Sequence, residues 1–233
     1  MNHLRTIRAL FKKDIKDTGK NANVLILLLL PVFFCVLYNL LDFGGEVLPP
    51  EFVLQLSVLM SLCLIPTSFL ASIIAEEKEK NTLRTLTLSG VTGGEFLCSK
   101  ALVTFLYMQG VNLVIFFVTG QPVDRLLWFF VCTTLTSVCM IFVGAFAGLL
   151  SKDQMSTSMI VVPFMLVFLI PPMFSGANDV LGTIAKFLPT AAMIRLYFQP
   201  DRDFALNFTV ILGWALAALA VFLLIFRKRK LDN

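Results

Sequence analysis

Six long apolar stretches dominate this chain of 233 residues and limit what it can fold into. They cover residues 24–41, 52–75, 96–119, 126–150, 155–174 and 207–226. A helix needs about 20 mainly apolar residues to cross the hydrocarbon core of a bilayer. Only 15% of the residues are charged and 58% are hydrophobic, which excludes an ordinary soluble domain. The sequence therefore predicts an all-α integral membrane protein with six transmembrane helices, in which residues 1–233 form a single domain.

The Lys and Arg residues are distributed unevenly between the two sides of the predicted bundle. Because cytoplasmic loops of membrane proteins are enriched in Lys and Arg, this distribution predicts the orientation of the chain. One side carries only Arg125, Lys186, Arg195 and Arg202. The other side carries Arg5, Arg8, Lys12, Lys13, Lys16, Lys20, Lys78, Lys80, Arg84, Lys100, Lys152, Arg227, Lys228, Arg229 and Lys230. Both termini and the connection between the second and third spans are therefore predicted to be cytoplasmic.

A charged segment, residues 76–95, lies between the second and third apolar stretches. It contains the pattern of a short helix that Asn81 caps and that Gly90 ends in the left-handed conformation. Thr92 and Glu95 have the spacing of a capping box, which begins the next helix. A simple connection between two spans needs only a few polar residues. We interpret the capped helix as a docking element, and a solvated charged linker is the alternative.

Two further segments outside the six stretches are predicted to be helical. Residues 1–20 have an amphipathic pattern, with apolar side chains on one side and basic side chains elsewhere, which is typical of an interfacial helix. Membrane lipid is therefore an expected partner, with the Lys and Arg side chains of this helix meeting anionic headgroups. A basic tail that only sets the orientation is the alternative. Residues 174–206 are too long and too apolar for a free loop, so we expect a re-entrant pair of short helices before the sixth span. Asn178 or Asp179 caps the first helix of this pair, and Pro189 separates it from the second.

Two spans contain residues that affect how helices bend and pack. Pro66 in the second span predicts a bend, and the neighbouring Thr67 and Ser68 can satisfy carbonyl groups that proline leaves unpaired. Gly144 and Gly148 in the fourth span allow another helix to approach closely. We expect that close contact to lie within one subunit rather than between subunits.

The sequence lacks the residues that enzymes and ion-coupled transporters need. It has no P-loop motif, and its single histidine, His3, belongs to no catalytic constellation. The five cysteines lie within predicted spans with no histidine or carboxylate beside them, so no metal site is expected. No charged residue lies near the middle of a predicted span, and Lys100 is placed in the first turn of the third. The chain is therefore not predicted to be an enzyme, and a transporter of this kind must draw its energy from another polypeptide.

Over its full length the chain resembles the permease subunits of bacterial type 2 ATP-binding-cassette exporters. The amphipathic start, the six spans with both ends inside, and the helical pair before the last span carry this resemblance. In that family the segment after the second span typically reads E-x-E-x-G-T-L-x-x-L-x-x-x-P. The matching residues here are Glu77, Glu79, Thr82, Leu83 and Leu86, while Asn81 replaces the glycine and Val91 stands near the proline.

The resemblance implies a permease dimer, formed with an identical copy or a paralogue, in the plasma membrane of a bacterium. Each permease would bind a cytoplasmic ATPase that carries ATP and Mg²⁺, while this chain itself would hold no cofactor and no nucleic acid. The residues implied for coupling to the ATPase are Glu76, Glu77, Glu79, Lys80, Thr82, Leu83, Arg84 and Leu86. The cargo cavity implied along the dimer axis would be lined by Gln55, Ser61, Thr67, Met159, Phe164 and Phe168.

The composition of the spans indicates what such a cavity would accept. With 23 Phe and 9 Met residues and no charge near the middle of a span, it suits a hydrophobic or amphipathic cargo. The leading hypothesis is therefore the membrane subunit of an exporter for a drug, a peptide antibiotic or a lipid-like molecule. The alternative is a membrane module that binds a peptide without pumping it, such as an immunity or sensor protein. A lipid-processing membrane enzyme is disfavoured, because the chain has no catalytic constellation.

Overall fold

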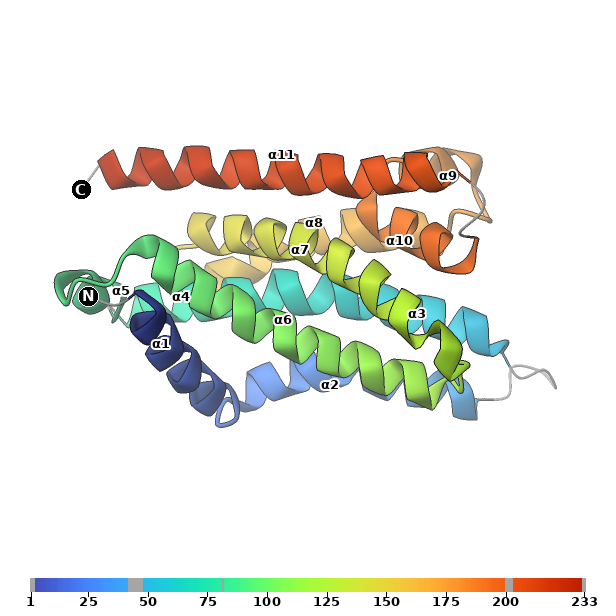
Figure 1. Cartoon of the computed structure of the whole chain (residues 1–233), viewed down its shortest axis with the longest axis horizontal. Coiled ribbons are helices and arrows are strands. Elements are labelled where there is room, and N and C mark those ends of the chain that lie inside the picture. The colour runs from blue at the N-terminus through green and yellow to red at the C-terminus, as the bar shows by residue number, and fades with distance from the viewer. Residues whose placement is uncertain (1–2, 42–47, 81, 200–202, 232–233) are drawn as a thin grey trace.

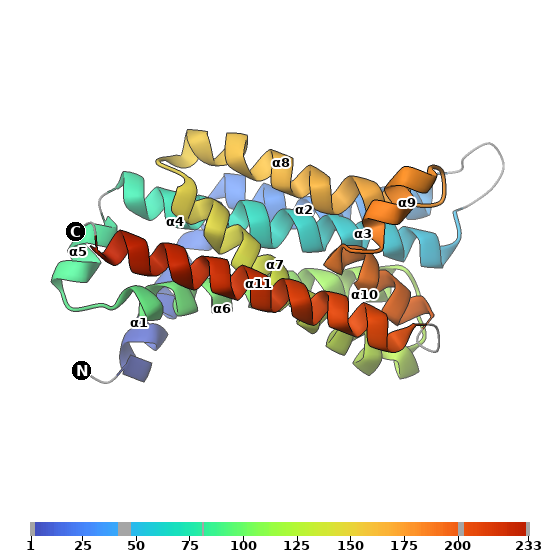
Figure 2. The same cartoon turned by 90° about the horizontal axis from the view of Figure 1, so that it is seen from above.

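The computed structural model describes residues 3–41, 48–80, 82–199 and 203–231, and every regular element within them is helical (Figure 1). The chain runs through α1 (His3–Thr18), α2 (Ala22–Leu40), α3 (Pro50–Leu64), η1 (Ile65–Phe69), α4 (Leu70–Glu79), α5 (Thr82–Leu88), α6 (Gly93–Val118), η2 (Val123–Arg125), α7 (Leu126–Leu150), α8 (Gln154–Met173), α9 (Asp179–Ala185), α10 (Pro189–Phe198) and α11 (Phe204–Leu231). The long helices lie side by side along one axis, as both views show (Figures 1 and 2).

Five helices of the described residues are long and apolar enough to cross a membrane, or up to six if a bent pair counts as one span. The five are Pro50–Glu79, Gly93–Val118, Val123–Leu150, Gln154–Met173 and Phe204–Val221. They confirm the second to sixth predicted stretches. The first predicted stretch, 24–41, coincides with the shorter apolar helix Val24–Leu40, so its length is less than that of the other five. This helix packs against α3 and α6 along the bundle.

The bent pair consists of α9 and α10, whose axes meet at 89°. Asn178 caps α9, because its side-chain oxygen accepts hydrogen bonds from the backbone N–H groups of Val180 and Leu181. Thr190 at the start of α10 donates to the carbonyl of Phe168 in α8 at 2.8 Å. The predicted pair of short helices before the last span is therefore present, and it packs on the bundle rather than forming a loop.

The second span is continuous through Pro66, where the helix widens into the π-helical turn η1. Proline cannot donate a backbone hydrogen bond, and a π-helical turn is one way for a helix to accommodate this loss. The Thr67 hydroxyl donates to the carbonyl of Cys63, so one of the two predicted hydroxyl groups does satisfy the backbone here. The result is a local change of helical pitch in the middle of a long, buried helix.

Gly144 and Gly148 of α7 pack directly against this widened part of the second span. A Cβ atom on Gly144 would lie 1.8 Å from the carbonyl oxygen of Pro66, and one on Gly148 would lie 2.9 Å from the Cα atom of Ala71. Both distances are shorter than van der Waals contact. The small residues therefore serve close packing within one subunit, as the sequence predicts.

We expect Gly144→Ala to destabilise the protein by about 1–3 kcal/mol, because its new methyl group would overlap backbone atoms that cannot rotate away. Gly110→Ala in α6 is the matched control, since nothing lies within 4 Å of its Cβ position. Thermal unfolding of both variants in detergent measures the difference. The close-packing interpretation is wrong if the two variants melt at the same temperature.

Candidate functional site

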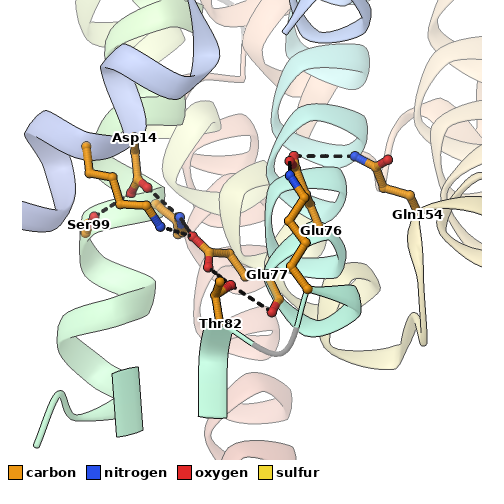
Figure 3. A network of polar contacts seen from close by, with 9 residues as sticks. Asp14, Glu76, Glu77, Thr82, Ser99 and Gln154 are labelled. Carbon is orange, nitrogen blue, oxygen red and sulfur yellow. Dashed lines mark hydrogen bonds and ion pairs between the residues drawn. The ribbon is translucent and has the colours of Figure 1, made fainter. Parts of the chain in front are cut away.

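A buried cluster of charges joins three helices at one end of the bundle (Figure 3). The Nζ atom of Lys100 in α6 lies 2.5 Å from Oδ1 of Asp14 in α1 and 2.9 Å from Oε1 of Glu77 in α4. The exposed fractions of these side chains are 2% for Lys100, 3% for Asp14 and 9% for Glu77. A charge at this depth is tolerated only with a hydrogen-bonded partner of opposite sign. The positions of the three helices therefore depend on one another.

Further hydrogen bonds extend this charge cluster. The Ser99 hydroxyl donates to Oδ2 of Asp14 at 2.8 Å, and Lys13 donates to Oε1 of Glu77 at 2.9 Å. The hydroxyl of Thr82, the first residue of α5, donates to the side-chain carboxylate of Glu77. It also lies 3.0 Å from the backbone carbonyl oxygen of Glu77. Burial alone would lower the pKa of Lys13, but the hydrogen bond and charge of Glu77 outweigh this effect and raise it. The cluster thus reaches from α1 and α6 to the beginning of α5.

The polar end of α4 also holds the adjoining ends of α7 and α8. Lys78 donates to the carbonyl oxygens of Gly148, Leu149 and Ser151 at 2.7, 2.7 and 2.9 Å. These carbonyls lie at the C-terminus of α7, where helices leave acceptors unpaired and favour a cation. Glu79 accepts a hydrogen bond from the backbone N–H of Gln154 at the start of α8. Lys78 and Glu79, at the end of α4, therefore connect this helix to α7 and α8.

The start of α6 has the predicted capping box. The Thr92 side chain accepts from the backbone N–H of Glu95 at 3.3 Å, and the Glu95 carboxylate accepts from that of Thr92 at 2.7 Å. Glu95 also lies 2.8 Å from Nδ1 of His3. Two contacts consequently attach α1 to α6. His3, at the beginning of α1, contacts Glu95, and Asp14, near the end of α1, contacts Lys100.

The short helix α5 presents different faces to the protein and to solvent. Leu86 is partly buried and packs against a core cluster that contains residues of α4, α6 and α7, including Phe96 and Leu97. Leu88 is 81% exposed. Gly90 follows with a φ of 85°, the left-handed stop that the sequence predicts. Leu88 is therefore an apolar side chain of α5 that the chain itself does not cover.

The predicted coupling residues fall into distinct groups. Glu77 and Thr82 belong to the buried charge cluster, and Glu76 pairs with Lys80 while it accepts a 3.5 Å hydrogen bond from Gln154 (Figure 3). Glu79 contacts α8, and Leu86 faces the interior. The predicted cap Asn81 and the side chains of Leu83 and Arg84 lie outside the described part of the structure. The exposed Leu88 belongs to the helix predicted to dock, although it is not among the coupling residues that the resemblance implies.

The predicted cavity residues are not all together. Phe164 and Phe168 line an apolar cavity of about 370 Å³ between α7, α8 and α11, whose wall also includes Phe146 and Trp214. Ser61 and Thr67 are fully buried in the second span. Met159 is 81% exposed on α8, and Gln55 is half-buried on α3. The single subunit therefore brings together two of the six residues.

A second, polar cavity of about 540 Å³ adjoins the charge cluster between α1, α4 and α6. Its wall contains both cations and carboxylates, including Lys13, Lys20, Asp17 and Glu76. Because the two signs of charge are mixed, the wall favours neither an anion nor a cation. Among the described residues, no group of His, Cys, Asp and Glu side chains is arranged to hold a metal ion.

Residues 50–227 match the profile of the family described as ABC-2 family transporter protein, a region that spans more than half of the chain. The chain belongs to the ABC-2 transporter family. It is a permease, the multi-pass membrane component of an ABC transporter, and ABC-2 permeases act with separate ATPase subunits. The permease has no ATPase of its own and is not itself an enzyme. A comparison with curated proteins gave no match.

Two members of the charge cluster of this ABC-2 permease escaped the sequence prediction. Lys100 was placed in the first turn of the third span, but α6 already begins at Gly93, so Lys100 lies about two turns inside it. Asp14 was not singled out from the sequence, and it lies with Leu10 and Thr18 on the buried face of α1. Two features of the sequence could have indicated the pair. Asp14 follows the apolar Leu10 by four residues, which places both on one face of a helix, and Lys100 is the lone lysine near the start of the third span.

Proposed function

We propose that this permease is the transmembrane subunit of an ATP-driven exporter for a hydrophobic or amphipathic cargo. A separate cytoplasmic ATPase would dock on α5 and supply the energy. The observation that supports this most is the combination of an exposed apolar residue, Leu88, with a continuous polar connection from the same helix into α4, α6 and α1. A helix that only links two spans needs neither feature.

Coupling would proceed through Thr82 and Glu77. A displacement of α5 would move Thr82, whose hydroxyl is bonded to Glu77 at the end of the second span. Glu77 is paired with Lys100, so α6 would move with α4, and Asp14 would carry α1 along. Packed elements of this kind transmit displacement because their interfaces have few alternative arrangements. The π-helical turn η1, farther along the same span, is the natural position for a hinge.

The cargo would be largely apolar. The cavity lined by Phe164 and Phe168 offers aromatic and aliphatic side chains, which is typical of sites for hydrophobic molecules. Gln55 and Met159 are proposed as further lining residues that a second permease would enclose. Ser61 and Thr67 are proposed to join them only when the second span moves, because both are buried within the single subunit. The second permease is an identical copy or a paralogue.

The proposed location is the plasma membrane of a bacterium, with both termini in the cytoplasm. The beginning of α1, the helix α5 and the end of α11 all lie at one end of the bundle, and α9 lies at the other (Figures 1 and 2). Most Lys and Arg residues belong to the end that holds α5, which supports this orientation.

We expect Leu88→Asp to weaken ATPase binding about thirtyfold or more, because a buried apolar contact residue at an interface contributes about 2 kcal/mol or more. The matched control is Val123→Asp, which makes the same change at a residue that is 68% exposed at the opposite end of the bundle. Co-purification of each variant with the co-expressed ATPase measures the effect. If Leu88→Asp retains the ATPase as well as Val123→Asp does, α5 is not the docking helix.

A further inference from the structure

The outward face of α1 carries four cations without partners in the described structure. Arg5, Arg8, Lys12 and Lys16 are all exposed, and no hydrogen bond or ion pair joins them to a described residue. At about 100° per residue they occupy one strip of the helix, opposite the buried Asp14. We call these four residues the cationic strip. The two acidic residues of α1, Asp14 and Asp17, lie away from it.

An apolar edge runs beside the cationic strip. Leu4 is 77% exposed and Ile15 is 38% exposed, and their helical positions adjoin that of Arg8. A helix with exposed apolar side chains next to a row of cations matches the boundary between lipid headgroups and acyl chains. The helix also leads directly into the apolar α2. Both features place the cationic strip at the level of the headgroups.

We infer that the cationic strip binds the headgroup phosphates of anionic phospholipids in the cytoplasmic leaflet. Each Lys or Arg near such a surface strengthens binding about fivefold. The opposite face of the same helix is attached to α6 through Asp14–Lys100 and His3–Glu95. Anionic lipid therefore holds the outer face of a helix whose inner face belongs to the charge cluster, and it sets the position from which α5 and α6 move. This last step rests on the proposed function, whereas the binding itself does not.

The binding is tested on the purified permease without its ATPase. Native mass spectrometry counts the phosphatidylglycerol molecules that the protein retains from mixed micelles of phosphatidylglycerol and phosphatidylcholine. In Arg5→Gln/Lys12→Gln, retention of phosphatidylglycerol should fall more than tenfold, while retention of phosphatidylcholine should not change. The matched control is Arg5→Lys/Lys12→Arg, which keeps both charges and should retain phosphatidylglycerol as the unaltered protein does. Size-exclusion chromatography verifies that both variants are folded.

Equal retention of phosphatidylglycerol in the charge-deleted variant and the charge-preserving variant would overturn the inference. The inference would also be wrong if the charge-deleted variant bound lipid normally but no longer assembled with the ATPase, since the cationic strip would then belong to that interface. A separate variant, Asp14→Asn, should keep its lipid and lose ATP-dependent transport. Normal transport in Asp14→Asn would count against the coupling proposal and leave lipid binding established, so the two failures are distinguishable.

Discussion

Replacing Lys100 with methionine should destabilise the permease by about 3–5 kcal/mol, the usual cost of removing one partner from a buried ion pair. Glu77 would still have Lys13, but Asp14 would keep only the hydroxyl of Ser99. A carboxylate that is 3% exposed cannot recover this loss from solvent. Denaturant unfolding of the purified protein in detergent gives the difference in free energy.

A charge-free variant separates stability from coupling. Asp14→Asn/Glu77→Gln/Lys100→Met removes all three buried charges together, so it should regain most of the stability that Lys100→Met loses. It should not regain ATP-dependent transport, because Thr82 would no longer be joined to α6 and α1 by charged groups. An unchanged unfolding free energy in Lys100→Met would contradict the structural role of the cluster. Full transport in the charge-free variant would contradict its role in coupling.

The local features of the fold could be predicted from the sequence because they depend on residues close together in the chain. The capping box of Thr92 and Glu95, the left-handed Gly90 and the cap at Asn178 each involve a backbone conformation and a hydrogen bond within a few residues. Such motifs have recognisable spacings. The helix ends that these motifs mark were therefore predicted well, including the start of α6 after Thr92.

The charge cluster could not be predicted in the same way. Lys100 is separated from Asp14 by 86 residues and from Glu77 by 23, so the pairing exists only after the helices have packed. In membrane helices that are apolar on every side, hydrophobic periodicity also does not show which face is buried. Ser61 and Thr67 were named as cavity residues from the family resemblance, and periodicity could not show that both are buried within the single subunit. Leu86 of α5 was assigned to docking from the resemblance, and the contacts that leave it partly buried involve residues distant in sequence.

ATP should be the only source of energy for cargo movement. The charged side chains of the described spans lie near span ends, and the one that is most deeply placed, Lys100, is already neutralised by Asp14 and Glu77. Binding and releasing a driving proton or sodium ion requires an ionisable side chain within the membrane that is free to change its state. The described residues of this permease offer no such group, so we expect the energy to enter through α5.

Transport in proteoliposomes that contain the permease and its ATPase tests most directly whether ATP alone drives cargo movement. A panel of fluorescent hydrophobic and amphipathic dyes serves as cargo, and both the ATP supply and the ion gradients are controlled. Dye movement should continue when proton and sodium gradients are collapsed, and it should stop when ATP is removed or the P-loop lysine of the ATPase is replaced. Dye binding without any ATP-dependent movement would favour a non-transporting immunity or sensor module instead. Movement that persists without ATP and follows the proton gradient would contradict the function proposed for this permease.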